Sequence, residues 1–314
     1  MKYRAILKHY WGYDDFRGIQ RNIIESISQG RDTLGLMPTG GGKSITFQVP
    51  ALAGEGLCIV VTPLIALMKD QVANLRSRGI KALAIYSGMR TSDIVTALEN
   101  CIFGDYKFLY ISPERIGSEL FLKKIQRVKV QLITVDEAHC ISQWGHDFRP
   151  AYRQISDLRK LFPGVPVLAL TATATPEVVK DIQQQLNFAQ PNCYSMSFAR
   201  NNLAYVVRNT ENKAAELLHI LGRIQGSAIV YTLNRKRTKE VCDFLVASGI
   251  TAEYYHAGLA PESKDAKEEA WKSGRARVMV STNAFGMGID KPDVRLVVHI
   301  DLPSSIEAYF QEAG

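Results

Sequence analysis

The sequence predicts an α/β fold with two domains, each a mainly parallel β-sheet flanked by helices. The first observation is length, because 314 residues correspond to two domains of about 150 residues each. The second is the alternation of short apolar segments with longer helix-like segments, which is typical of parallel sheets covered by helices on both faces. The third is composition, since 46% hydrophobic and 22% charged residues are typical of a folded globular chain.

Nine short apolar segments are predicted to be buried strands, because each is followed by polar, Gly or Pro residues and then by a helix-like stretch. Five come before residue 200, namely Asp32–Met37, Leu57–Thr62, Phe108–Ile111, Leu132–Val135 and Val167–Leu170. Four come after residue 208, namely Ser227–Tyr231, Thr251–Tyr255, Arg277–Ser281 and Leu296–Ile300. Polar residues between Arg200 and Arg208 interrupt the alternation, so we predict domains at residues 1–206 and 207–314.

The net charge of +7 is unevenly distributed along the chain. Residues 1–205 contain 24 Lys and Arg against 17 Asp and Glu, an excess of 24 − 17 = 7, whereas residues 206–314 contain 14 of each. A basic surface is typical of proteins that bind polyanions, although many soluble proteins are mildly basic without doing so. Charge alone therefore only favours a nucleic-acid partner.

The cysteine spacing and the apolar pattern both predict an intracellular protein. The five cysteines are far apart and form no C-x-x-C pair, which predicts reduced thiols and no zinc site within these residues. They are Cys58, Cys101, Cys140, Cys193 and Cys242. Because there is neither a bilayer-length apolar run nor a signal-peptide segment, we expect a soluble protein without a membrane partner, cytoplasmic in a bacterium or nuclear in a eukaryote.

A phosphate-binding loop is predicted at Pro38–Ser44, between a strand and a helix. Glycines let successive backbone N–H groups point at phosphate oxygens next to a helix N-terminus. In this pattern Lys43 reaches the β- and γ-phosphates and the Ser44 hydroxyl binds Mg²⁺. The strict pattern has Gly where this chain has Met37, and the alternative is a Gly-rich turn with an incidental lysine. The predicted phosphate-binding residues are Thr39, Gly40, Gly41, Gly42, Lys43 and Ser44.

A second part of the same site is predicted at Asp136-Glu137-Ala138-His139, where an apolar strand ends. Ligands bind at the carboxyl ends of strands in open α/β sheets, so Asp136 is expected to hold Mg²⁺ and Glu137 to orient or deprotonate a water. The alternative is a helix start with acidic residues in its first turn. Together the two motifs predict that Lys43, Asp136 and Glu137 catalyse hydrolysis of a nucleoside triphosphate. They do not indicate which molecule the protein moves with the energy of hydrolysis.

The N-terminal segment carries a more specific pattern, Leu7-x₃-Trp11-Gly12-x₃-Phe16-Arg17-x₂-Gln20. It resembles the adenine-recognition motif of RecQ-family helicases, which belong to superfamily 2. The resemblance implies that Gln20 and Arg17 select ATP, and a glutamine amide does offer the donor and acceptor that match an adenine edge. The alternative is an amphipathic helix whose aromatic residues lie in the core.

The segment Ile141–Tyr152 follows directly and is rich in aromatic and basic residues, which suit stacking on single-stranded bases. It resembles the aromatic-rich loop of RecQ helicases, which couples DNA binding to ATP hydrolysis. The resemblance implies DNA contacts by Trp144, Phe148 and Arg149, with His146 as the link toward the nucleotide. The alternative is a packed loop with Trp144 buried.

Further segments resemble helicase motifs and follow the order of the family. In the first part, Thr62-Pro63-Leu64 with Ala66–Gln71, and Ser112–Arg115, resemble strand-binding motifs, and they are followed by Thr171–Ala174. In the second part they are Tyr231-x-x-Asn234-Arg235, His256–Leu259 and Ser281–Asp290. The resemblance implies that Thr171 and Thr173 link hydrolysis to strand separation, and that Gly288 and Asp290 bind nucleotide.

The resemblance as a whole implies two RecA-like domains that bind ATP and Mg²⁺ between them and act on single-stranded or tailed duplex DNA with 3′→5′ polarity. One alternative is another superfamily 2 translocase that acts on RNA or on duplex DNA. A second is a fragment that binds ATP and nucleic acid with little turnover, because the sequence ends at Gln311–Gly314, where the family motif continues into catalytic arginines.

Overall fold

The computed structural model describes residues 2–145, 147–197, 199–200, 202–285 and 291–313. The chain separates into two compact units, Met1–Ala199 and Arg200–Gly314. The division lies beside the polar segment that interrupts the alternation of strands and helices in the sequence. Among the described residues, no helix combines the length and the apolar character needed to cross a bilayer.

The first unit contains a seven-stranded sheet in which all neighbouring strands are parallel. Its strands are β1 (Thr33–Leu36), β2 (Leu57–Val61), β3 (Ala82–Ile85), β4 (Phe108–Ile111), β5 (Val130–Val135), β6 (Val167–Thr171) and β7 (Cys193–Ser195). The order across the sheet is β3-β4-β2-β5-β6-β1-β7. Strands β3 and β7, one at each edge, were missed by the sequence analysis because β3 is alanine-rich and β7 has three residues.

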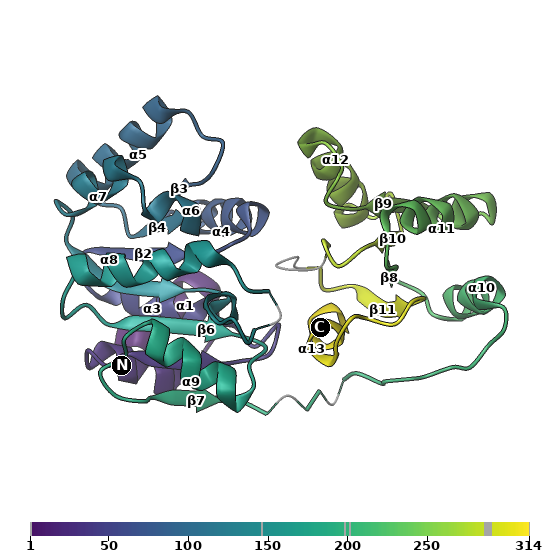
Figure 1. Cartoon of the computed structure of the whole chain (residues 1–314), viewed down its shortest axis with the longest axis horizontal. Coiled ribbons are helices and arrows are strands. Elements are labelled where there is room, and N and C mark those ends of the chain that lie inside the picture. Colours follow the sequence, from purple (N-terminus) through teal and green to yellow (C-terminus); the bar gives the residue numbers. More distant parts are fainter. Residues whose placement is uncertain (1, 146, 198, 201, 286–290, 314) are drawn as a thin grey trace. The chain divides into compact units, whose positions relative to one another are not determined.

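Helices cover both faces of this sheet (Figure 1). They are α1 (Lys2–Trp11), α2 (Gln20–Ser28), α3 (Ile45–Ala53), α4 (Ile65–Ser77), α5 (Thr91–Phe103), α6 (Pro113–Ile116), α7 (Glu119–Ile125), α8 (Ile155–Leu161) and α9 (Pro176–Gln185), with the 3₁₀ helices η1 (Ala138–Ile141) and η2 (Pro150–Gln154). Apolar residues of α2, α3 and α4 pack on one face, and those of α5, α7, α8 and α9 pack on the other. Helix α1 packs on α2 and α3 through Leu7.

The strand order determines which loops lie side by side. Strands β5, β6 and β1 are neighbours, so the segments after Val135, Thr171 and Leu36 leave the sheet at the same carboxyl edge. The Met37 N–H donates to the Thr171 carbonyl at 3.0 Å, which ties two of these segments together. The predicted phosphate loop, the acidic motif and the Thr171–Ala174 segment are therefore adjacent, although up to 136 positions separate their residues in the chain (174 − 38 = 136).

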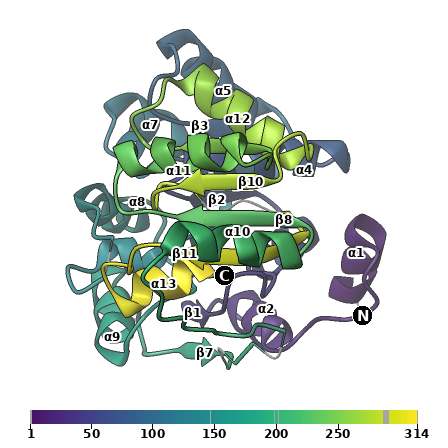
Figure 2. The same cartoon turned by 90° about the vertical axis from the view of Figure 1, so that its right-hand side faces the viewer.

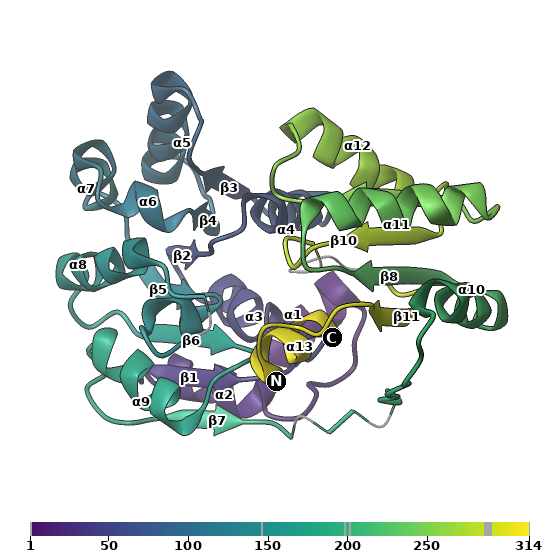
Figure 3. The ribbon, with the colours of Figure 1, turned by 45° about the vertical axis from the view of Figure 1, so that its right-hand side comes forward.

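The second unit contains a four-stranded parallel sheet, whose strands β8, β10 and β11 lie side by side in Figure 3. The strands are β8 (Ser227–Tyr231), β9 (Ala252–Tyr255), β10 (Val278–Ser281) and β11 (Val294–His299), in the order β11-β8-β10-β9. The helices are α10 (Lys213–Arg223), α11 (Arg235–Ala247), α12 (Pro261–Lys272) and α13 (Ile306–Ala313). Apolar residues of α10 and α11 pack on one face, which is toward the viewer in Figure 2, and Trp271 of α12 packs on the other.

Candidate active site

The segment Pro38–Ser44 forms a tight loop between β1 and α3. Gly40 and Gly42 have φ angles of 74° and 75°, a region that side-chain-bearing residues rarely adopt. A Cβ on Gly41 would lie 2.9 Å from the Pro38 carbonyl oxygen, so a side chain there would push the loop open. The glycines at these three positions therefore have steric reasons to be present, and the loop delivers Lys43 and Ser44 to the start of α3. Thr39 lies within the same turn.

Lys43 and Glu137 form an ion pair at the carboxyl edge of the sheet. The Lys43 Nζ lies 3.6 Å from the Glu137 Oε1, with side-chain exposures of 17% and 14%. Glu137 has φ 46° and ψ 47°, a left-handed backbone that is uncommon outside glycine and is often found at functional sites. The structure thus brings together two of the three predicted catalytic residues, with an ammonium and a carboxylate facing each other.

Asp136 completes the acidic pair at the end of β5. Its N–H donates to the Val61 carbonyl at 2.8 Å, and its Oδ1 accepts the Glu137 N–H at 3.0 Å. Burial, together with the neighbouring negative charge of Glu137, raises the pKa of Asp136 to about 6. A divalent cation would favour the ionised form again, and carboxylate and hydroxyl oxygens suit Mg²⁺. The donor set of Asp136 and Ser44 therefore fits this ion.

His139 connects the acidic motif to the neighbouring strand. Its Nδ1 lies 2.8 Å from the Thr171 Oγ1 and 3.4 Å from the Glu137 Oε2, and the ring is buried. The Thr171 hydroxyl also accepts the Thr173 N–H at 3.3 Å. A line of polar contacts therefore runs from Lys43 through Glu137 and His139 to the Thr171–Ala174 segment.

Gln20 is buried, and its amide binds main-chain groups of this chain. Its Oε1 accepts the Arg17 N–H at 2.8 Å, and its Nε2 lies 3.3 Å and 3.1 Å from the carbonyl oxygens of Gly41 and Gly42. The predicted adenine reader thus supports the phosphate loop. The Arg17 guanidinium is exposed, 5.2 Å from the centre of the Tyr13 ring.

The aromatic side chains Trp11 and Phe16 of the same segment are partly buried and pack against the cluster formed by α1, α2 and α3. The alternative interpretation of the N-terminal motif, in which its aromatic residues pack against the core, therefore describes these two rings. In this motif the two rings therefore pack against the core, and Gln20 contacts the phosphate loop.

The loop after η1 presents Trp144 to solvent, with 78% of the residue exposed. Its alternative role as a buried core residue is therefore wrong. Phe148 is half-buried, with the Arg153 guanidinium 5.3 Å from its ring centre. His146, the predicted link to the nucleotide, lies outside the described residues, as do Gly288 and Asp290 of the second unit.

Arg149 braces this loop. Its guanidinium donates two hydrogen bonds to Asp147 Oδ2, at 3.0 and 2.8 Å, and one to the Pro63 carbonyl at 3.4 Å. Its N–H donates to the Cys140 carbonyl at 2.8 Å. Arg149, which the resemblance places in contact with DNA, thus holds the loop against the segment after β2. A DNA phosphate would have to share the Arg149 guanidinium with Asp147 and Pro63.

Three potential metal ligands, His139, Cys140 and Asp147, lie within 4.8 Å of one another. Each is used in another way: His139 contacts Thr171, the Cys140 thiol donates to Asp147 at 3.7 Å, and Asp147 pairs with Arg149. A guanidinium at the carboxylate opposes a cation there. The trio is therefore better described as part of the loop's own packing.

Several contacts of the site had no role in the sequence analysis. The Tyr152 hydroxyl donates to the Asp136 carbonyl at 2.9 Å, and the Ser142 hydroxyl to Asp181 Oδ2 at 2.5 Å. Gln48 of α3 donates to Gln71 of α4 at 3.2 Å. None of these pairings has a signal in the local sequence, because each joins residues that only the tertiary fold brings together.

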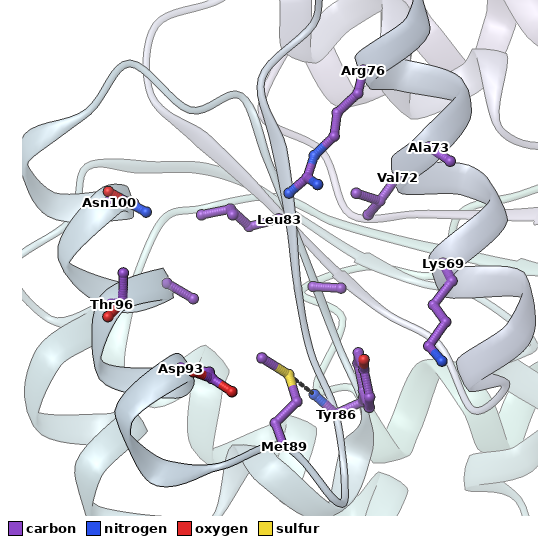
Figure 4. A pocket seen from close by; sticks show the side chains of 12 residues that line it. Lys69, Val72, Ala73, Arg76, Leu83, Tyr86, Met89, Asp93, Thr96 and Asn100 are labelled. Carbon is purple, nitrogen blue, oxygen red and sulfur yellow. Dashed lines mark hydrogen bonds between the residues drawn. The ribbon is translucent and has the colours of Figure 1, made fainter.

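A cavity of about 510 Å³ lies at the edge of the sheet rather than at this site (Figure 4). Its floor is β3 and its walls are α4 and α5, and no residue of the phosphate loop or the acidic motif lines it. Arg76 donates to the Ala82 carbonyl at 2.9 Å and the Tyr86 N–H contacts the Met89 sulfur at 3.4 Å. Side chains thus cover part of this open strand edge, as is common in native sheets.

Most of the chain matches known helicase families. Residues 17–182 match the family described as DEAD/DEAH box helicase, and residues 212–314 match the helicase conserved C-terminal domain. The chain therefore belongs to the DEAD/DEAH box helicase family.

Among curated proteins, the chain is similar to bacterial RecQ helicases. It is 44% identical over 99% of its length to the ATP-dependent DNA helicase RecQ of Bacillus subtilis, of which it covers 53%. It is 41% identical over 98% of its length to the RecQ of Pasteurella multocida, of which it covers 49%. The chain thus spans about half the length of these curated relatives.

Solved structures show the same fold. The Mycobacterium smegmatis helicase Lhr bound to ssDNA and AMP-PNP aligns with a TM-score of 0.78 and 20% identity, over 98% of this chain and 45% of Lhr. The L327V variant of S. cerevisiae Dbp5 bound to RNA and ADP BeF3 aligns with a TM-score of 0.77 and 18% identity, over 98% of this chain and 82% of Dbp5. The predicted fold of two RecA-like domains is therefore confirmed.

Proposed function

We propose that this chain is the motor core of a DNA helicase, which binds ATP with Mg²⁺ and single-stranded or tailed duplex DNA and couples hydrolysis to unwinding with 3′→5′ polarity. The observation that carries the proposal is the line of contacts from Lys43 through Glu137 and His139 to Thr171. It joins a phosphate-binding lysine to the segment expected to respond to DNA. The RecQ relatives in Bacillus subtilis and Pasteurella multocida are ATP-dependent DNA helicases, which supports the same activity.

In this proposal the phosphate loop binds the triphosphate through its backbone and through Lys43. The ammonium now facing Glu137 would then face phosphate oxygens, which releases the Glu137 carboxylate to orient the attacking water. Ser44 and Asp136 would hold Mg²⁺, which supplies positive charge to the phosphate oxygens when bound. Gln20 and Arg17 would bind adenine, and the Gln20 amide would exchange at least one of its main-chain contacts to do so.

The DNA strand would bind on the exposed ring of Trp144, with Phe148 and Arg149 beside it. Stacking on an aromatic face tolerates any base, as a motor that moves along DNA requires. Thr171 and Thr173 would transmit the presence of the strand, because the Thr171 hydroxyl contacts both His139 and the Thr173 N–H. The positions His146, Gly288 and Asp290 remain expectations of the sequence resemblance.

The test is steady-state ATP turnover with and without single-stranded DNA, for the wild type and for Glu137→Gln. We expect DNA to stimulate the wild type, and the variant to bind ATP but to lose about 10²–10⁴ in turnover, as for a general base. A Glu137→Gln variant with undiminished turnover would refute the assigned role.

Duplexes with single-stranded tails separate the alternatives. Unwinding of 3′-tailed DNA, without unwinding of 5′-tailed DNA or tailed RNA, is the expected result. Preference for RNA or for blunt duplex would indicate another kind of superfamily 2 translocase, and binding of ATP and DNA without turnover would indicate a binding fragment.

A further inference from the structure

Ser142 lies at the base of the exposed Trp144 loop and is fully buried. Its hydroxyl donates to Asp181 Oδ2 at 2.5 Å, a distance typical of a hydrogen bond to an ionised carboxylate. The Ser142 Oγ also accepts a hydrogen bond from the Trp144 N–H at 3.2 Å. One serine side chain thus binds both the loop that carries the exposed ring and the helix α9.

Asp181 is itself held in place. Its second oxygen accepts from Gln185 Nε2 at 3.2 Å, and the Thr175 side chain caps the N-terminus of α9 by accepting the Val178 N–H. Helix α9 follows directly on the Thr171–Ala174 segment. The Asp181 carboxylate therefore has a defined position on α9, the helix that follows β6.

Two side-chain contacts attach the acidic motif to the same β6–α9 segment. His139 contacts Thr171 at one end of η1, and Ser142 contacts Asp181 at the other. The loop also folds tightly back onto η1, because a Cβ on Gly145 would lie 2.4 Å from the His139 carbonyl oxygen. The Trp144 ring is thus attached to a short, doubly fixed segment that begins at Glu137.

We propose that Ser142 and Asp181 are a positioning pair, which fixes the Trp144 loop relative to Glu137 so that strand binding changes the hydrolytic site. This inference rests on the proposed function. Neither side chain touches nucleotide in the proposal, and both act through the position of the loop. Without the hydroxyl, we expect the loop to keep its Arg149 contacts and its buried neighbours Cys140 and Ile141, and to lose its side-chain attachment to α9.

The direct measurement is hydrogen exchange, because the Trp144 N–H donates to the Ser142 hydroxyl. In Ser142→Ala and in Asp181→Ala we expect faster exchange across residues 141–149, with unchanged exchange in β5 and β6. Ser142→Thr keeps a hydroxyl and should restore slow exchange. Unchanged exchange in both variants would overturn the positioning role, whether or not the chain is a helicase.

The functional measurement is ATP turnover with and without single-stranded DNA in the full chain. We expect turnover without DNA to stay within about twofold and stimulation by DNA to fall at least about fivefold, the lower end of typical coupling effects. The double variant should be no worse than either single variant, because both remove the same bond. Equal loss of turnover with and without DNA, or additive losses, would contradict the proposal.

Ser156→Ala is the matched control. The Ser156 hydroxyl donates to the Arg153 carbonyl at 2.8 Å, within its own segment, so the same substitution removes a hydroxyl without detaching the loop. We expect wild-type exchange and wild-type stimulation. If wild-type turnover does not respond to DNA, the proposed function fails, while the exchange experiment still decides whether Ser142 holds the loop.

Discussion

At the scale of single residues, the role proposed for the Lys43 ammonium in ATP turnover can be tested directly. The ammonium faces Glu137 at 3.6 Å, and no DNA-contacting role is assigned to it. We expect Lys43→Ala to abolish nearly all ATP turnover, because the positive charge at the phosphates is lost, while single-strand affinity stays within a few-fold of wild type. Nucleotide turnover and fluorescence anisotropy with labelled DNA measure the two effects separately.

Circular dichroism provides the control for this variant, since a folded spectrum excludes a general loss of structure. An equal loss of DNA affinity and turnover in a folded protein would contradict the assignment of Lys43 to the phosphates.

Trp144 offers a second test at the scale of residues. Because 78% of the residue is exposed, we expect its removal to weaken DNA stacking and not the packing of the core. Trp144→Ala should weaken strand binding by about 1–3 kcal/mol, the usual contribution of one stacked base. The melting temperature should hardly change, since truncating a buried large aromatic would cost about 3–5 kcal/mol and this ring is not buried. A thermal melt and a DNA titration measure both quantities, and a large drop in melting temperature would contradict the exposed position.

At the scale of elements, α8 is joined to the sheet by a largely buried ion pair. Arg159 donates to both carboxylate oxygens of Asp32, at 2.9 and 2.6 Å, and Asp32 also accepts the Val167 and Ala189 N–H groups. Because removing the guanidinium leaves the buried Asp32 carboxylate with only its two main-chain hydrogen bonds, we expect Arg159→Ala to destabilise the first unit by about 3 kcal/mol, the lower end for breaking a buried ion pair.

The neighbouring Lys160 is the control for this prediction. It pairs with Asp157 at 2.8 Å on the exposed side of the same helix, so Lys160→Ala should cost less than about 1 kcal/mol. Urea denaturation followed by fluorescence measures both variants. Similar losses in the two would show that the buried pair has no special contribution.

At the scale of the whole molecule, the basic excess of residues 1–205 predicts salt-sensitive DNA binding. On a logarithmic plot, single-strand affinity should fall linearly with salt, with a slope of about −0.7 for each phosphate neutralised. Lys69→Ala should make the slope shallower by about 0.7, because the exposed lysine of α4 lies in a predicted strand-binding motif. Trp144→Ala should lower affinity at every salt concentration without changing the slope, and a change in slope there would contradict stacking.

Local sequence was sufficient for the fold class and for most strands. Val167–Leu170 and Leu57–Thr62 are almost wholly apolar, which is typical of short strands covered by helices on both faces of the sheet. The edge strands β3 and β7 were not predicted, because Ala82–Ile85 is short and alanine-rich and Cys193–Ser195 has only three residues. Edge position and shortness remove the apolar pattern on which such predictions depend.

The sequence by itself was enough to predict the chemistry of the site, because Lys43, Ser44, Asp136 and Glu137 stand in motifs that follow the order of the helicase family. The tertiary structure alone decided how these groups are held. The strand order β5-β6-β1 places His139 beside Thr171, and the packing of α9 brings Asp181 to Ser142. Such pairs join residues 32 and 39 positions apart (171 − 139 and 181 − 142), and hydrogen bonds at that separation depend on backbone paths that no local pattern encodes.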